Sequence, residues 1–216
     1  MTGVAGANVQ PWTWEDAVRL GKLTLAAVCA ALLLAALVGP ASAGRLSLSA
    51  LRVRTTWSRI NWRGALGTVE CEVILNSGFH ERTFVKTPLR LIGFVTAGNI
   101  NRCAKGSATL LRETLPWHLR YDSFSGALPR IASITARVIG MSFRFSEPVF
   151  RIECLSATTP EAPGLFIFNR DTTTGATTSV ALGGSIRCGG AINGSVEGNT
   201  TNIVEDGGAR LTVTLI

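Results

Sequence analysis

Apolar and polar residues alternate along several short segments of this chain. One segment has apolar side chains at every second position, Val69, Cys71, Val73 and Leu75, and polar side chains between them, Glu70, Glu72 and Asn76. The same period of two surrounds Cys154 and Cys188 and returns over residues 209–215. This period predicts β-strands that bury one face. Denser apolar runs at residues 89–95 and 165–168 predict strands that are covered on both faces.

The alternation changes parity within residues 131–145. Apolar residues occupy even positions from Ile134 to Val138 and odd positions from Ile139 to Phe145. One inserted residue moves every later side chain of a strand to the opposite face. We therefore predict a β-bulge near Ile139 and Gly140.

The fold class follows from these periods. No segment after Val38 has a sustained helical period of 3.6 residues, and turn signals separate the alternating segments. About ten short strands at this spacing predict an all-β fold, a single antiparallel β-sandwich or barrel-like domain over residues 44–216. From about residue 171 the chain becomes rich in Gly and Thr. We expect this part to form an exposed C-terminal edge of the domain, with loops around residues 171–178 and 197–208.

The N-terminal segment has the pattern of an export signal. Arg19 and Lys22 precede the apolar run 23–38, and Pro40 and the triplet Ala41-Ser42-Ala43 follow it. This order predicts a cleavable signal peptide over residues 1–43, with cleavage after Ala43. A retained membrane anchor is the alternative, but the run is shorter than the roughly 20 residues that span a bilayer. We therefore expect a secreted or cell-envelope protein with no membrane span after cleavage.

The cysteines support export. The chain has five, of which Cys29 falls in the predicted signal, leaving Cys71, Cys103, Cys154 and Cys188. An even number of cysteines in an exported chain predicts two disulfides. The sequence leaves all three connectivities open, and sequential pairing closes the shortest loops. The chain has only two histidines and no Cys-x-x-Cys pair, so we expect neither a metal site nor a cofactor.

Charge suggests a binding surface near the start of the mature chain. The sequence has 21 Lys and Arg against 14 Asp and Glu, a formal net charge of +7. Arginines alternate with tryptophans in one stretch without acidic residues: Arg52, Arg54, Trp57, Arg59 and Trp62. Such residues can bind anionic groups and stack on sugars or bases. Because an exported protein is a poor partner for nucleic acid, we expect an anionic cell-wall polymer or a glycan as the partner. The alternative is a strand whose arginines are simply its wet face, with tryptophans packed beneath a loop.

The segment 115–131 contains the other candidate residues. Its alternation places His118, Arg120 and Asp122 on one face of a strand. His118 and Asp122 lie four strand residues apart, about 13 Å, which excludes a local catalytic dyad. His118 and Arg120 remain candidates for a binding surface, and we expect no catalytic residue because motifs for a serine or metal-dependent hydrolase are absent from the sequence.

The same segment carries a resemblance. The pattern Leu115-Pro-Trp-His, then Tyr121-x-Ser-Phe-x-Gly-x-Leu-Pro129, with Cys71 before it and Cys154 after it, resembles exported bacterial proteins of unknown function. The resemblance covers roughly residues 69–156. It implies no activity, cofactor or functional residue.

Three functions fit the sequence. The leading one is a non-enzymatic exported module that binds ligands or has a structural role in the cell envelope or outside the cell. The second is a surface-fibre subunit that exchanges strands, suggested by the alternating residues 46–49 and by the strand predicted at Leu215. The third is a secreted hydrolase that uses His118. The sequence does not indicate an oligomeric state.

Overall fold

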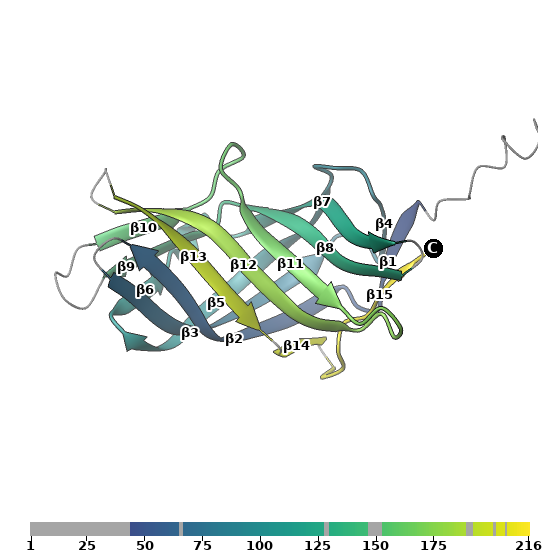
Figure 1. Cartoon of the computed structure of the whole chain (residues 1–216), viewed down its shortest axis with the longest axis horizontal. Coiled ribbons are helices and arrows are strands. Elements are labelled where there is room, and N and C mark those ends of the chain that lie inside the picture. Colours follow the sequence, from purple (N-terminus) through teal and green to yellow (C-terminus); the bar gives the residue numbers. More distant parts are fainter. Residues whose placement is uncertain are drawn as a thin grey trace, which may run out of the picture. The chain divides into compact units, whose positions relative to one another are not determined.

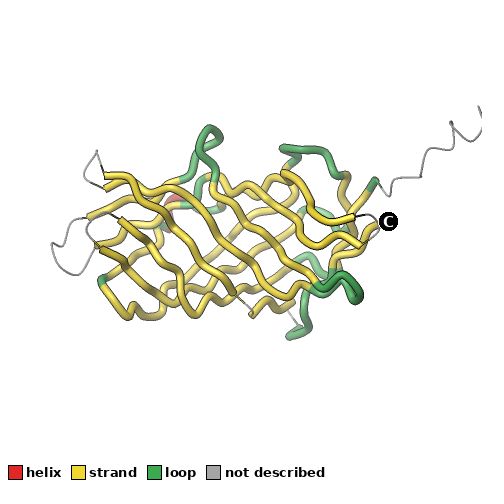
Figure 2. Tube along the Cα trace, in the orientation of Figure 1, coloured by secondary structure: helices red, strands yellow, loops and turns green. Residues whose placement is uncertain are grey.

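The computed structural model describes residues 44–64, 67–127, 130–146, 153–188, 192–200, 202–205 and 207–216. The predicted signal peptide lies outside the described residues. Strands make up most of the described chain (Figures 1 and 2). They are β1 (Arg45–Leu48), β2 (Arg52–Gly64), β3 (Gly67–Phe79), β4 (Thr83–Val85), β5 (Leu91–Lys105), β6 (Ser107–Leu110), β7 (Trp117–Ala127), β8 (Arg130–Ile139), β9 (Ser142–Ser146), β10 (Glu153–Ala157), β11 (Gly164–Arg170), β12 (Thr177–Cys188), β13 (Ile192–Thr200), β14 (Asn202–Glu205) and β15 (Val213–Leu215), with one 3₁₀ helix, η1 (Arg112–Thr114).

The large antiparallel sheet closes on itself. Its strand order is β11-β8-β7-β5-β3-β2-β13-β12-β10-β9-β6, and β11 also pairs with β12. The strands from β11 to β12 therefore form a ring, in which half of the neighbouring pairs are consecutive in the sequence: β2–β3, β7–β8, β11–β12 and β12–β13. The all-β prediction is confirmed, and this ring is the barrel-like form of the two architectures that the sequence left open.

Several long strands of the barrel are interrupted, which is why the described residues hold more strands than the ten or so expected. At one end β6, β9 and β10 pair in series and join the ring through β12 (Figure 1). The break between β8 and β9 falls at Gly140, whose φ is +85°. Val138 and Met141 on either side of it are both buried. The predicted parity change is confirmed, although it occurs as a gap between two strands and not as a bulge within one.

Aromatic side chains fill the interior of the barrel. Trp57, Trp62, Trp117 and Phe143 are all 0% exposed. The ring of Phe143 lies 5.3 Å from that of Trp62 and 5.2 Å from that of Trp117, both edge to face. A barrel of this size is just wide enough for side chains to fill. The inner face is therefore the hydrophobic core, and a large ligand would approach the outer face.

A smaller sheet packs at the other end of the barrel. Its order is β15-β1-β4, with Leu46 of β1 opposite Leu215 on one side and opposite Phe84 on the other. Leu46, Phe84 and Val213 are buried in the same hydrophobic cluster as the barrel interior. Figure 1 shows this sheet beside the C-terminus.

Three sequence predictions were wrong. Residues 89–95 and 165–168 are not covered on both faces, since Leu89, Leu91 and Leu165 are 51%, 40% and 36% exposed. The Gly- and Thr-rich part is not a sheet edge, because β12 and β13 each pair on both sides within the barrel. Residues 197–208 are not all loop, since they include the end of β13 and all of β14. Glycine supplies no side chain to alternate, so the period of two was hidden in these strands.

The first predicted disulfide is confirmed. Cys71 of β3 is bonded to Cys103 of β5. Cys154 is also disulfide-bonded, and it lies opposite Cys188 in the register of β10 with β12. The Cys154–Cys188 bond itself remains a prediction, because the side chain of Cys188 lies outside the described residues. Within the described part of the chain, none of the helical structure reaches the length and apolarity that crossing a membrane requires.

Candidate functional site

Strand β2 places Arg52 and Arg54 on the outer face of the barrel. Val53 and Thr55 are each 4% exposed and point inward, so the two arginines alternate with them and point outward. Across β3, Arg52 lies opposite Gly78 and Arg54 opposite Asn76. On the other side of β2, Arg54 lies opposite a residue of the short strand β14.

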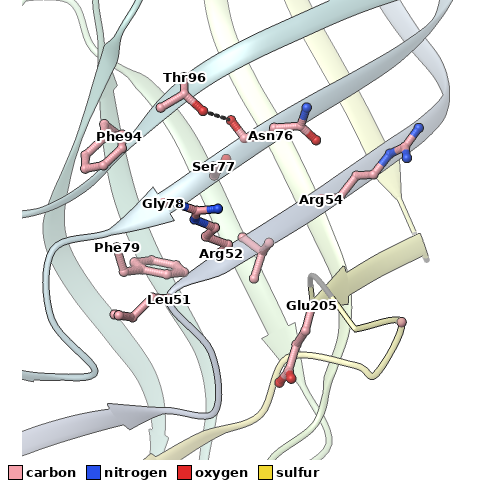
Figure 3. Close-up of a pocket in the computed structure, with 12 residues that line it drawn as sticks. Leu51, Arg52, Arg54, Asn76, Ser77, Gly78, Phe79, Phe94, Thr96 and Glu205 are labelled. Atoms are coloured by element: carbon pink, nitrogen blue, oxygen red, sulfur yellow. Dashed lines mark hydrogen bonds between the residues drawn. The ribbon is translucent and has the colours of Figure 1, made fainter.

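A pocket of about 810 Å³ opens over these strands (Figure 3). Its described residues combine an apolar side with two guanidinium groups, polar side chains and the carboxylate of Glu205. Its lining residues are Leu51, Arg52, Val53, Arg54, Asn76, Ser77, Gly78, Phe79, Phe94, Thr96, Glu205 and Gly208. The size and mixed lining are typical of sites that bind small molecules or single units of a polymer.

The charges of the pocket favour an anion. The guanidinium of Arg54 is exposed and makes no ion pair or hydrogen bond with any other described residue. The Glu205 carboxylate accepts a hydrogen bond from the Ser49 hydroxyl. The described lining residues include two arginines and one carboxylate, which together carry a net positive charge.

Contacts between strands fix the other side of the pocket. The Thr96 hydroxyl donates a hydrogen bond of 3.2 Å to the backbone carbonyl of Asn76, which joins β5 to β3 (Figure 3). A Cβ atom on Gly78 would lie 3.0 Å from Cε2 of Phe94, so the missing side chain lets the edge of the Phe94 ring rest on the strand. The centroid of the His80 ring lies 5.0 Å from that of the Phe94 ring.

The prediction that two tryptophans of β2 contact a ligand was wrong. Trp57 and Trp62 are fully buried in the barrel. Their positions have opposite parity, and both still point inward because the β2–β3 register shifts between Trp57 and Ile60. The irregularity leaves Ser58 and Arg59 both exposed. The alternative interpretation of the sequence was right that the tryptophans are buried, but they pack in the core of the barrel and not beneath a loop.

Arg59 lies outside the pocket and is engaged elsewhere. Its Nε is 3.6 Å from a carboxylate oxygen of Glu70, and the Lys105 ammonium lies 3.5 Å from the other oxygen of the same carboxylate. Arg59 is therefore part of a surface ion-pair network beside the disulfide. Of the basic candidates in β2, only Arg52 and Arg54 line the pocket.

His118 and Arg120 lie on the outer face of β7. His118 is exposed and stands opposite Phe94 in the register of β5 with β7, so it continues the cross-strand row that runs from Arg52 through Phe94. Arg120 is half-buried, and its Nε has no hydrogen-bond partner among the described residues. The Asp122 carboxylate is 2.6 Å from Nε of Arg137. The carboxylate nearest to His118 in sequence is thus held by a different cation.

Metal ligands do not gather in the described part of the chain, where no group of three His, Cys, Asp or Glu side chains could hold an ion.

The sequence analysis found only Arg52 and Arg54 among the pocket residues, and the residues that it missed include Asn76, Phe94, Thr96 and Glu205. They come from three strands that only the sheet register brings together. A polar residue or phenylalanine on the wet face of a strand has no local sequence signal. The pairing of β2 with both β3 and β14 creates the site.

Comparisons with known proteins found no matching protein family, no similar curated protein and no similar solved structure.

Proposed function

We propose that this protein is an exported, non-enzymatic binding module of the cell envelope or the extracellular space, and that its outer pocket binds anionic polymers or glycans. The observation that carries the proposal is the pair Arg52 and Arg54, which project from alternate positions of β2 into one pocket.

The chemistry of arginine supports an anionic ligand. A guanidinium group donates two parallel hydrogen bonds to a carboxylate, sulfate or phosphate group. Alternate residues of a strand are about 6.7 Å apart, so two such groups can contact successive charges of a polymer. Arg54 is exposed and has no partner among the other described residues, so a ligand would not have to displace one.

The remaining charge distribution supports the same site. Five acidic side chains are engaged by arginine or lysine elsewhere on the barrel: Glu70, Glu72, Glu81, Asp122 and Glu197. These pairs neutralise part of the basic surface. Surface ion pairs of this kind contribute little to stability, about 0–1 kcal/mol each, but they reduce the local positive potential.

Retention on an immobilised anionic polymer tests the binding function. The double variant Arg52→Ser/Arg54→Ser should elute at lower salt than the parent protein. The control is Arg130→Ser/Arg144→Ser, which removes the same charge from two exposed arginines on β8 and β9. If counterion release governs binding, the slope of log affinity against log salt should fall by about two for the first variant only. Equal losses in both variants would mean that only net charge matters.

Export is a separate part of the proposal and has its own test. The signal pattern of residues 1–43 and the Cys71–Cys103 disulfide support it. N-terminal sequencing of the protein recovered outside the cytoplasm should begin at Gly44. A protein that stays in the cytoplasm with its first residues intact would contradict export.

The contacts of the described residues do not favour either alternative function, the strand-exchanging fibre subunit or the secreted hydrolase. The two strands that suggested strand exchange, β1 and β15, pair with each other within the chain. The hydrolase would need a carboxylate for His118, whereas the register neighbours of His118 are Phe94 and Ile139. These contacts favour neither strand exchange nor hydrolysis over a binding function.

A further inference from the structure

We propose that the pocket recognises acidic sugars, so that the ligand is a glycan with carboxylate groups and not a polyphosphate. This inference rests on the proposed function and narrows it. It is based on the apolar and polar groups that line the pocket beside the arginines. These groups would contribute little to a ligand that is bound by charge alone.

The first observation is the apolar side of the pocket. Leu51, Phe79 and Phe94 lie together in Figure 3, away from Arg54. Leu51 is 38% exposed, and Phe94 is only partly buried. An exposed aromatic ring gains by covering the apolar face of a sugar ring, which removes apolar surface from water on both partners. A polyphosphate chain has no apolar face to offer.

The second observation is that Phe94 is held in place. Its Cε2 and Cζ atoms would lie 3.0 and 3.1 Å from a Cβ on Gly78, so the ring rests directly on the strand. The His80 ring also packs against it, with the two ring centroids 5.0 Å apart. A ring that is already ordered loses little side-chain entropy when a ligand covers it.

The third observation concerns the polar groups. Asn76 and Thr96 are exposed at the pocket and can exchange hydrogen bonds with sugar hydroxyls. Glu205 adds a carboxylate to the same pocket. A carboxylate accepts hydrogen bonds from hydroxyl groups and repels a dense polyanion, so its presence favours a ligand with many hydroxyls and few charges.

The dimensions fit a short segment of such a polymer. Two strand spacings separate Arg52 from Phe94, because the register runs from Arg52 through Gly78 to Phe94. This is roughly 10 Å between the backbones. One sugar ring can therefore lie on Phe94 while a carboxylate of the same or the next unit reaches an arginine. The volume of about 810 Å³ leaves room for this arrangement.

Three probes separate the contributions of charge and of the sugar. Oligogalacturonate carries sugar rings with carboxylates, polyphosphate carries charge without sugar, and dextran carries sugar without charge. We expect the parent protein to bind oligogalacturonate most tightly, polyphosphate more weakly, and dextran not measurably in titration calorimetry. Each titration is done at one fixed salt concentration with the full mature chain.

Two variants then assign the roles. Phe94→Ala should weaken oligogalacturonate binding about fivefold and leave polyphosphate binding unchanged, because one aromatic contact contributes that order of affinity. Arg54→Ser should weaken both. Phe124→Ala is the control, since Phe124 is also a partly buried phenylalanine but lies outside the pocket on β7. Phe94→Leu keeps an apolar side chain if the alanine variant unfolds, and it should also weaken oligogalacturonate alone.

The outcomes distinguish this inference from the proposed function. Polyphosphate binding as tight as oligogalacturonate binding, or unchanged affinity of both Phe94 variants, would overturn the acidic-sugar inference and leave an anion-binding module standing. Failure of both anionic probes to bind, or affinity that does not respond to Arg54→Ser, would overturn the proposed function as well.

Discussion

Replacing Gly93 by alanine should destabilise the barrel more than any other single added methyl group near the pocket. Gly93 lies in β5, opposite Phe79 of β3 and Leu119 of β7. A Cβ atom at this position would stand 2.4 Å from the carbonyl oxygen of Gly78, well inside the 3.0 Å that real Cβ atoms keep. The obstacle is backbone and not a flexible side chain, so β3 and β5 would have to separate.

The magnitude follows from two costs. Overpacking with backbone movement costs about 1–3 kcal/mol. Separating the strands also weakens at least one β3–β5 hydrogen bond, which contributes about 1 kcal/mol. We therefore expect a loss of about 3 kcal/mol in the free energy of unfolding. Because Gly78 and Phe94 adjoin this contact, the variant should also disturb the floor of the pocket.

Gly183→Ala is the matched control. It adds the same methyl group to β12, where nothing lies within 4 Å of the new Cβ atom. Stability is measured by urea denaturation, followed by tryptophan fluorescence. The urea concentration at the unfolding midpoint should be about 1–2 M lower for Gly93→Ala than for the parent, if the unfolding free energy falls by about 2 kcal/mol per M of urea. The control should stay within about 0.5 kcal/mol of the parent protein. Equal stability of Gly93→Ala and the parent would refute the tight β3–β5 contact, and so would an equal loss in both variants.

Three further predictions concern the core and the disulfide. Burial, together with the nearby charge of Asp122, raises the pKa of Tyr121 above its usual value. Folding therefore favours the neutral phenol of Tyr121. The stability that depends on this neutral form is complete below about pH 10 and is lost as the pH rises through the raised pKa. Tyr121 is the only tyrosine in the chain, so phenolate absorbance reports it directly, and a midpoint at or below 10 in the folded protein would contradict its burial. Trp62→Ala should cost about 3–5 kcal/mol of unfolding free energy, whereas Trp62→Phe should cost much less, because the buried indole nitrogen has no hydrogen-bond partner among the described residues. Replacing Cys71 and Cys103 by serine reopens a loop with a sequence separation of 32 residues and should lower the unfolding free energy by about 4 kcal/mol in urea melts, and an unchanged melt would count against the bond.

The sequence predicted the strands well where apolar side chains mark both parity and its change. The shift near Gly140 was visible because large apolar residues stand on both sides of it. The shift in β2 between Trp57 and Ile60 was not, because the extra positions, Ser58 and Arg59, are polar like the rest of the outer face. Closure of the barrel through β11 and β12 depends on long-range pairing, which no local pattern encodes.

Only the part of the candidate site that is local in the sequence was predicted. Arg52 and Arg54 were found because they are neighbours in sequence and in a stretch without acidic residues. Phe94 and Glu205 were missed because strand register brings them to the arginines from distant parts of the chain. Leu89 was expected to be covered, yet it is exposed in a turn with a positive φ of 66°. A run of apolar residues does not show where the chain turns, so burial could not be predicted for its first residue.

The location of ligand contact tests the proposed site most directly. Backbone amide resonances of isotope-labelled protein spanning residues 44–216 can be followed by NMR during titration with oligogalacturonate. We predict that the largest shifts gather on β2, β3 and β5 around Arg54, Asn76 and Phe94, and that they vanish in Arg52→Ser/Arg54→Ser. Shifts centred on β8 and β11, or shifts that persist in the double variant, would show that the arginine-lined pocket is not the binding site.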